Sequence, residues 1–243
     1  TRGEGLADFR VRPTHLAAVA IPGLFTGPDA DIPGSIFGVV SRELSTPFGL
    51  CSLSPDDPHF HPLYEKDGWY GPASSLHNGP IDVRFLPVYL ASLRCVLSEH
   101  DPRSGSGLFC NTARLFFSSP FPGSLTRYLD AAPGDSGEPA MRGPDADIPA
   151  TAGFIEAAFC DVIGFRPRLS ENRLTLAPNL PQGQGHAETS LPFGPGWTLD
   201  IKLERSGSGS GTGERSGYHA EVLWRVGGDD APAVTLSLIH ISQ

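Results

Sequence analysis

The residues best suited to chemistry lie in short segments rich in proline and glycine. Asp56 and Asp57 stand between two prolines in the segment 54–58, and Glu138 lies in the segment 134–139. Carboxylates of this kind transfer protons or accept hydrogen bonds from hydroxyl groups. Each also has an ordinary structural use, because Asp beside Pro commonly forms a hydrogen-bonded turn and a loop Glu is commonly solvated. From these residues alone both uses stay open.

Histidine and aromatic side chains supply a second set of candidates. His77 precedes Asn78, and both can donate hydrogen bonds to a ligand or be packed within the protein. His59 and His61 have the spacing of a metal-binding pair, but no third ligand accompanies them in the sequence, so we expect no metal and no cofactor. Trp69 can stack on a ring of a ligand or pack within its own loop.

The composition describes an acidic protein with enough apolar residues for a core. The chain has 243 residues, of which 39% are hydrophobic, and a formal net charge of −9. That charge argues against nucleic acid or an anionic membrane as a partner. The sequence has no apolar run near the ~20 residues that span a membrane, no signal-peptide core at its first residues, no glycine-rich phosphate loop and no GxSxG elbow. We therefore expect a cytoplasmic protein that binds neither nucleic acid nor membranes.

The four cysteines are too few and too far apart for a disulfide scaffold or a CxxC zinc site. Cys95, Cys110 and Cys160 lie in apolar contexts, which predicts buried and reduced thiols. This pattern is typical of a reducing compartment.

The heptapeptide GPDADIP occurs twice, at 27–33 and 143–149, and each copy leads into apolar residues at helical spacing. We therefore expect each copy to begin a helix. Apolar periodicity predicts further helices at 14–24, 85–97 and 105–117. Later segments have the pattern of strands, at 173–177, 198–204 and 219–226. The sequence thus predicts an all-helical region to about residue 165 and then a small antiparallel β module over 166–234.

The last residues differ from the rest of the chain. Leu236–Ile241 reads LSLIHI, which resembles the translated end of an adapter used in library preparation. We therefore expect residues 235–243 to be a non-native tail without function.

Four blocks between residues 8 and 94 keep a common order and spacing. They are 8–13 (DFRVRP), 43–50 (ELSTPFGL), 52–58 (SLSPDDP) and 76–80 (LHNGP). Together they resemble the C-terminal glucosidase region of glycogen debranching enzymes, the amylo-α-1,6-glucosidases, and more broadly the glycoside hydrolases with an (α/α)6 toroid. Residues 165–204 are similar to the closing segment of several such glycosidases. The resemblance implies a mainly α fold, with residues 1–165 as the C-terminal part of a toroid catalytic domain.

The resemblance also implies inverting hydrolysis of a glycosidic bond in an α-glucan or related oligosaccharide. This reaction needs two carboxyls about 6.5–9.5 Å apart, one to protonate the leaving oxygen and one to activate a water molecule. In the resembled family the general acid lies upstream of the part that this chain contains, and Glu138 best matches the general base. The residues implied to bind the sugar are Asp56, Asp57, His77, Asn78, Arg12 and Trp69. For Arg12 an ordinary surface ion pair is the alternative.

The sequence departs from the family where tryptophan is usual. Residues 81–84 (IDVR) and 151–154 (TAGF) stand where the family has a tryptophan that packs on sugar rings, and Thr14 replaces an asparagine. The alternatives are therefore a non-catalytic carbohydrate-binding relative, or another toroid glycosidase or phosphorylase. Because the chain opens without Met and holds one of the two carboxyls, we expect a fragment that is inactive alone. Its expected partners are an oligosaccharide or polysaccharide and the missing N-terminal part of the same polypeptide.

Overall fold

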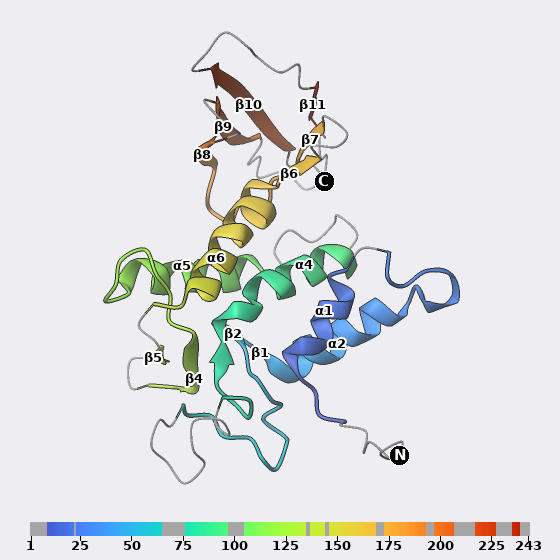
Figure 1. The fold of residues 1–243 in the computed structure, drawn as a ribbon, viewed down its shortest axis with the longest axis vertical. Coiled ribbons are helices and arrows are strands. Elements are labelled where there is room, and N and C mark those ends of the chain that lie inside the picture. The colour runs from blue at the N-terminus through green and yellow to red at the C-terminus, as the bar shows by residue number, and fades with distance from the viewer. Residues whose placement is uncertain are drawn as a thin grey trace. The chain divides into compact units, whose positions relative to one another are not determined.

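The computed structural model describes most of the chain as helices, strands and connecting loops (Figure 1). The described residues are 9–21, 23–64, 76–96, 105–134, 137–143, 146–168, 173–192, 197–206, 217–226 and 235–238. Contacts divide the chain into two compact units. The first unit comprises residues 1–99 and 107–155, and the second unit comprises residues 100–106 and 156–243.

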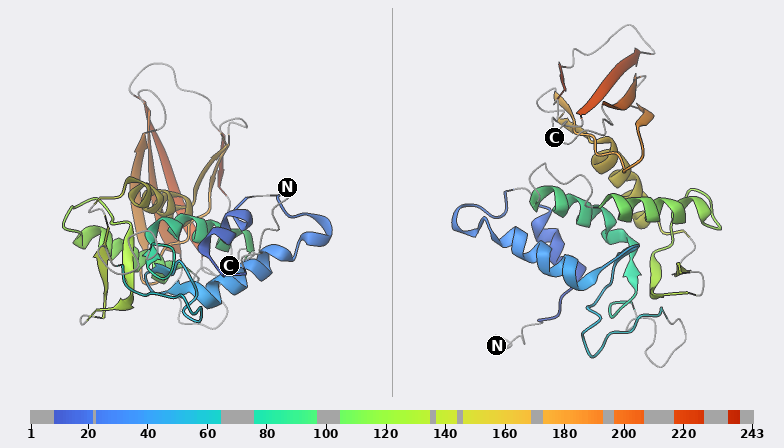
Figure 2. Two further views of the ribbon diagram at one scale, coloured as in Figure 1. Left: turned by 60° about the horizontal axis from the view of Figure 1, so that its bottom comes forward. Right: turned by 180° about the vertical axis from the view of Figure 1, so that it is seen from behind.

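The helices of the first unit bury apolar residues, except the short η2 (Gly27–Asp29), which has no buried residue. In chain order the helices are η1 (Pro13–His15), α1 (Leu16–Val19), η2 (Gly27–Asp29), α2 (Ile32–Leu44), η3 (Val83–Phe85), α4 (Leu86–Val96), α5 (Ser106–Ser118) and α6 (Ile148–Ala157). Helix α1 contacts α2 and α4, which also contact each other (Figure 1 and Figure 2). Leu16, Leu44 and Leu90 are buried at these contacts. None of the described helices is long and apolar enough to cross a bilayer.

Both copies of the GPDADIP repeat lead into a helix, which confirms that expectation. Helix α2 begins at Ile32 and α6 at Ile148, in each case with proline as the next residue. Proline suits this place because the first N–H groups of a helix have no partner within it. Asp147 caps α6, since its Oδ1 accepts a hydrogen bond from the Ala150 N–H at 2.8 Å. Asp31 makes no such bond.

Two small antiparallel sheets complete the first unit. Strands β1 (Ser45–Thr46) and β2 (Gly49–Leu50) form a hairpin directly after α2. The second sheet has the order β3-β4-β5, with β3 (Ile81–Asp82), β4 (Tyr128–Pro133) and β5 (Pro139–Arg142). A single bridge between Cys51 and Ile81 places the end of the hairpin beside β3.

The second unit consists of the π-helix η4 (Ala158–Ile163) and two sheets. One sheet has the order β10-β9-β8, and its strands are β8 (His186–Pro192), β9 (Trp197–Ser206) and β10 (Gly217–Val226). The other has the order β11-β7-β6, and its strands are β6 (Phe165–Arg168), β7 (Arg173–Leu176) and β11 (Thr235–Leu238). The long strands β9 and β10 lie side by side (Figure 2). Residues of both sheets form the buried core, among them Leu174, Leu199 and Ile201. The predicted strands correspond to β7, β9 and β10.

The expected mainly α fold is wrong, because the chain is a mixed α/β structure. Strands β1–β5 lie within the stretch that was expected to be all-helical, so the partial toroid is not supported either. The strands β1, β2 and β3 have two residues each, which is too short for any periodicity. The first three residues of β4 are all buried, so that strand shows no alternation of apolar and polar residues.

The prediction that Cys95, Cys110 and Cys160 are buried is also wrong. Cys95 is exposed, whereas Cys110 and Cys160 are half-buried. The buried cysteine is Cys51, and burial raises the pKa of its thiol to about 11.

Gly164 offers a test of how the second unit is held together. Its backbone is left-handed (φ +74°), and a Cβ there would lie 2.0 Å from the carbonyl carbon of Ala177. Gly183 is also left-handed (φ +86°), but its Cβ would meet nothing within 4 Å. We expect Gly183→Ala to lower the free energy of unfolding by about 1 kcal/mol through backbone strain. Gly164→Ala should lower it by more than ~2 kcal/mol, because the clash is added. Urea titration followed by circular dichroism measures both, and equal losses would contradict the clash.

Candidate functional site

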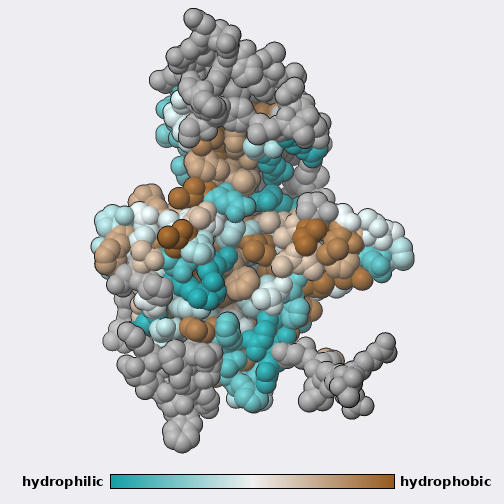
Figure 3. Space-filling view, viewed as in Figure 1, coloured by the Kyte–Doolittle hydropathy of each residue, from teal (hydrophilic) through white to brown (hydrophobic). Residues whose placement is uncertain are grey.

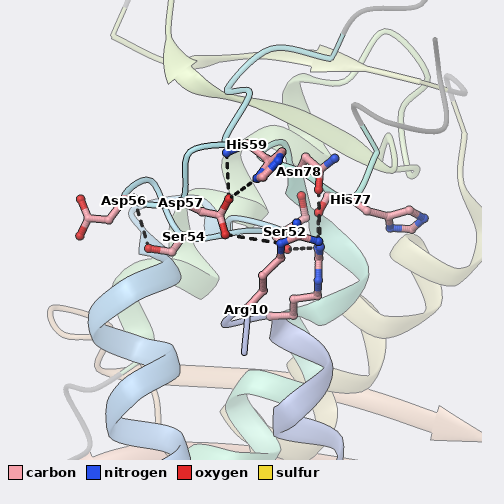
Figure 4. A network of polar contacts seen from close by, with 9 residues as sticks. Arg10, Ser52, Ser54, Asp56, Asp57, His59, His77 and Asn78 are labelled. Atoms are coloured by element: carbon pink, nitrogen blue, oxygen red, sulfur yellow. Dashed lines mark hydrogen bonds and ion pairs between the residues drawn. The ribbon is translucent and has the colours of Figure 1, made fainter. Parts of the chain in front are cut away.

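Most of the predicted sugar-binding residues lie together in the first unit. We call this group the loop cluster and define it as Arg10, Arg12, residues 52–61 and residues 77–80 (Figure 4). Residues 52–61 follow β2, and residues 77–80 precede β3. Trp69 lies outside the described residues, so its role stays a prediction.

Backbone hydrogen bonds hold the two loops of the cluster edge to edge. The Ser52 N–H donates to the Pro80 carbonyl at 3.1 Å, and the His61 N–H donates to the Asn78 carbonyl at 2.6 Å. The Gly79 N–H donates to the hydroxyl oxygen of Ser52 at 2.8 Å. A Cβ at Gly79 would lie 1.9 Å from the His61 carbonyl oxygen, so this close approach requires glycine.

Arg12 joins the two loops through its guanidinium group. This residue is the N-cap of η1, where its Nη1 donates to the carbonyl oxygens of Ser52, at 3.2 Å, and of His77. Its Nη2 lies 3.5 Å from Oδ1 of Asn78. Because the guanidinium is a rigid planar fork of donors, one side chain fixes two loops that are distant in sequence. These contacts give Arg12 a positioning role in the loop cluster.

Asp57 takes part in a turn. Its Oδ1 accepts a hydrogen bond from the His59 N–H at 2.8 Å and lies 3.1 Å from Nδ1 of the same residue. Its Oδ2 lies 3.6 Å from Nε of Arg10. The hydrogen bond from the His59 backbone, with the His59 side chain and Arg10, holds the pKa of Asp57 below its ordinary 3.8 although burial opposes this. The side chain is thus engaged in the structural turn that the flanking prolines predict.

Asp56 and His77 are the predicted residues whose side chains the cluster does not use. Both are exposed, and among the described residues neither side chain has a hydrogen-bond partner. Only the backbone N–H of Asp56 is bonded, to the Ser54 hydroxyl at 3.3 Å. Figure 4 shows the Asp56 carboxylate and the His77 imidazole at opposite sides of the cluster. The structure therefore brings Arg12, Asp57 and Asn78 together but does not direct Asp56 and His77 toward one space.

Glu43 is a carboxylate beside the loop cluster that was not among the predicted site residues. It lies near the end of α2, where its Oε2 accepts a hydrogen bond from the Ser54 hydroxyl at 3.1 Å. Its Oε1 accepts from Nη2 of Arg42 at 3.1 Å. Helix α2 thereby supports the turn that holds Asp56 and Asp57. Its place in the block 43–50 was the signal that pointed to it.

Glu138, the predicted general base, lies in the turn between β4 and β5. The Gly134 N–H donates to the Glu138 carbonyl at 2.9 Å, and Gly137 in this turn is left-handed (φ +78°). The Glu138 side chain is 49% exposed, and its Oε1 lies 3.4 Å from Nη2 of Arg114 on α5. Glu138 and the loop cluster thus belong to different elements, and this ion pair directs the carboxylate toward α5.

Two buried carboxylates on neighbouring strands were not predicted. Asp82 of β3 is 5% exposed and pairs with Arg84, whose Nη2 lies 2.5 Å from its Oδ2. Asp130 of β4 is 3% exposed and pairs with Arg142 at 2.9 Å. Buried charges need partners of this kind. Within the described part of the chain no three His, Cys, Asp or Glu residues are grouped as metal ligands would be.

The low pKa of Asp57 predicts a pH dependence of stability. The ionised carboxylate stabilises the fold at a pH above its unfolded-state pKa, and this contribution is lost as the pH falls through the lower folded-state pKa. We therefore expect the melting temperature of the wild type to fall more steeply than that of Asp57→Asn as the pH falls below the unfolded-state pKa of about 3.9. Thermal unfolding at several pH values in this range measures the two slopes. Equal slopes would show that the turn contributes nothing to acid stability.

A known sequence family matches the first part of the chain. Residues 2–109 match the family described as Amylo-alpha-1,6-glucosidase. No curated protein matches the chain significantly. The matched residues include the whole loop cluster and end before Glu138. Residues 2–109 thus carry the glucosidase-region sequence of debranching enzymes, and the resemblance predicted from the four blocks is confirmed.

Proposed function

We propose that this chain is part of a glycoside hydrolase of the amylo-α-1,6-glucosidase type, which hydrolyses a glycosidic bond of an α-glucan with inversion. The family match over residues 2–109 carries the proposal, because it makes this segment a glycoside hydrolase-related region. The loop cluster lies inside that segment and exposes polar side chains. Sugars are recognised largely by hydrogen bonds to their hydroxyl groups, which such side chains supply.

In this proposal the loop cluster divides into a frame and a binding edge. Arg12, Asp57 and Asn78 form the frame, since each has a side-chain contact with another residue of the cluster. The exposed imidazole of His77 donates a hydrogen bond to a sugar hydroxyl. The Asp56 carboxylate lies at the opposite side of the cluster from the His77 imidazole, so the two side chains do not bind the same sugar unit. Trp69, whose place in the sequence is between the two halves of the cluster, is the proposed stacking residue.

Glu138 is the proposed general base. A half-exposed carboxylate has access to the water that it must activate, and the ion pair with Arg114 orients it. The general acid is proposed to come from an upstream part of the same polypeptide. An oligosaccharide or polysaccharide is accordingly the substrate, and no cofactor takes part in the proposed reaction.

Glucose release from an α-1,6-branched limit dextrin tests this proposal, with the chain joined to the upstream part of its own polypeptide. We expect Glu138→Gln to lower the rate by about 10²-fold or more, because a general base contributes that much. Glu156→Gln is the matched control, since Glu156 is an exposed residue of α6 with no proposed role. His77→Ala should raise KM more than it lowers kcat. Equal rates for wild type and Glu138→Gln would remove Glu138 from the mechanism.

A non-catalytic carbohydrate-binding relative is the second candidate. The observation that favours it is the end of the family match before Glu138, the one proposed catalytic carboxylate of this chain. This candidate predicts no glucose release from any α-glucan, together with limit-dextrin binding that His77→Ala weakens.

A further inference from the structure

The segment between His61 and Asn78 begins and ends in the loop cluster, because the backbone of these two residues is hydrogen-bonded at 2.6 Å. After His61 the chain leaves the cluster and runs along β4. There the Ala131 N–H donates to the Pro62 carbonyl at 2.7 Å. The start of this segment is thus attached to a strand that lies outside the matched residues 2–109.

The side chain of Asp130 on β4 also holds the start of this segment. Its Oδ1 accepts a hydrogen bond from the Tyr64 N–H at 2.8 Å, and its Oδ2 accepts one from Nε of Arg142 at 2.9 Å. The Tyr64 ring stacks on that of Tyr128, with ring centres 5.3 Å apart. The Asp130 side chain is 3% exposed, so its carboxylate is buried at both bonds, whereas the Arg142 side chain is 47% exposed.

The hairpin that Asp130 stabilises also carries the proposed base. Strands β4 and β5 pair up to Pro133 and Pro139, and the Gly134 N–H closes the turn on the Glu138 carbonyl. Arg142 lies on β5, so Oδ2 of Asp130 binds β5. Oδ1 of Asp130 binds the segment after His61, through the Tyr64 N–H. We infer that Asp130 is a positioning residue that couples the loop cluster to the hairpin of Glu138, an inference that rests on the proposed function.

Asp82 provides a matched control for Asp130. Both carboxylates are buried, both are paired with an arginine, and they lie on adjacent strands of one sheet. The partners of Asp82 are Arg84, two residues along the same segment, and Arg127, whose Nε lies 3.8 Å from Oδ2 of Asp82. Loss of the Asp82 charge therefore disturbs the sheet without releasing Tyr64.

The test compares Asp130→Ala, Asp130→Asn and Asp82→Asn in the full chain by two measurements. The first is the affinity for an α-1,6-branched malto-oligosaccharide, from NMR titration. The second is hydrogen exchange of the backbone amides of Tyr64, His61 and Gly134, whose N–H donates to the Glu138 carbonyl. We expect Asp130→Ala to weaken binding by about 10-fold or more and to speed exchange at all three amides, because a hydrogen bond to a charged group is lost. Asp130→Asn keeps an oxygen for the Tyr64 N–H and should have a smaller effect. Asp82→Asn should leave affinity and these amides unchanged.

Similar effects of Asp130→Ala and Asp82→Asn would overturn the inference, because general destabilisation would then explain both. It is also overturned if Asp130→Ala speeds exchange at Tyr64 and leaves the Gly134 amide of the Glu138 turn unaffected. If the wild type binds no oligosaccharide, the proposed function fails, while the exchange measurement still decides whether Asp130 couples the two parts.

Discussion

Arg12 donates hydrogen bonds to the backbone carbonyls of Ser52 and His77, and the geometry of the loop cluster depends on this one guanidinium. The two loops are 40 and 65 residues away from it, and a loop closed over such distances loses considerable chain entropy. Donors on a rigid fork offset that cost better than a flexible ammonium group, so lysine is a poor substitute here. Gly79 adds a steric condition, because its contact with the His61 carbonyl leaves no room for a side chain. Together these two residues determine where the edge of the cluster lies.

This arrangement separates side chains that build the cluster from those that can meet a ligand. Asp57 and Arg12 are charged groups in hydrogen bonds within the protein, and such bonds stabilise the fold. Breaking them to bind a sugar would cost that stabilisation. Side chains that have no partner to lose, such as the His77 imidazole, bind a hydroxyl without that cost. Figure 3 shows hydrophilic and apolar patches next to each other on one face of the first unit.

The sequence predicted the helices and strands that have a periodic pattern of apolar residues of their own. Helices α2, α4, α5 and α6 follow from apolar spacing and from the GPDADIP repeat, and β7, β9 and β10 follow from their strand patterns. The short strands of the first unit had no such pattern, because pairing with distant residues creates them. The same reason explains the site. The four blocks predicted which segments belong together, but not that Asp56 and His77 point apart. Asp130 had no local signal, since its partner Tyr64 lies 66 residues away.

The replaced tryptophan has a structural explanation in the first unit. Ile81, Asp82 and Val83 stand at the first family tryptophan position. All three are buried, and Asp82 is paired with Arg84. This stretch belongs to the core of the first unit, so these three side chains offer no exposed surface on which a sugar ring could stack. Asp57, Asp82 and Asp130 all have partners within the protein. Among the carboxylates that we proposed for the site, Asp56 and Glu138 are exposed. The distinction between a hydrolase and a binding protein depends on what these two carboxylates do.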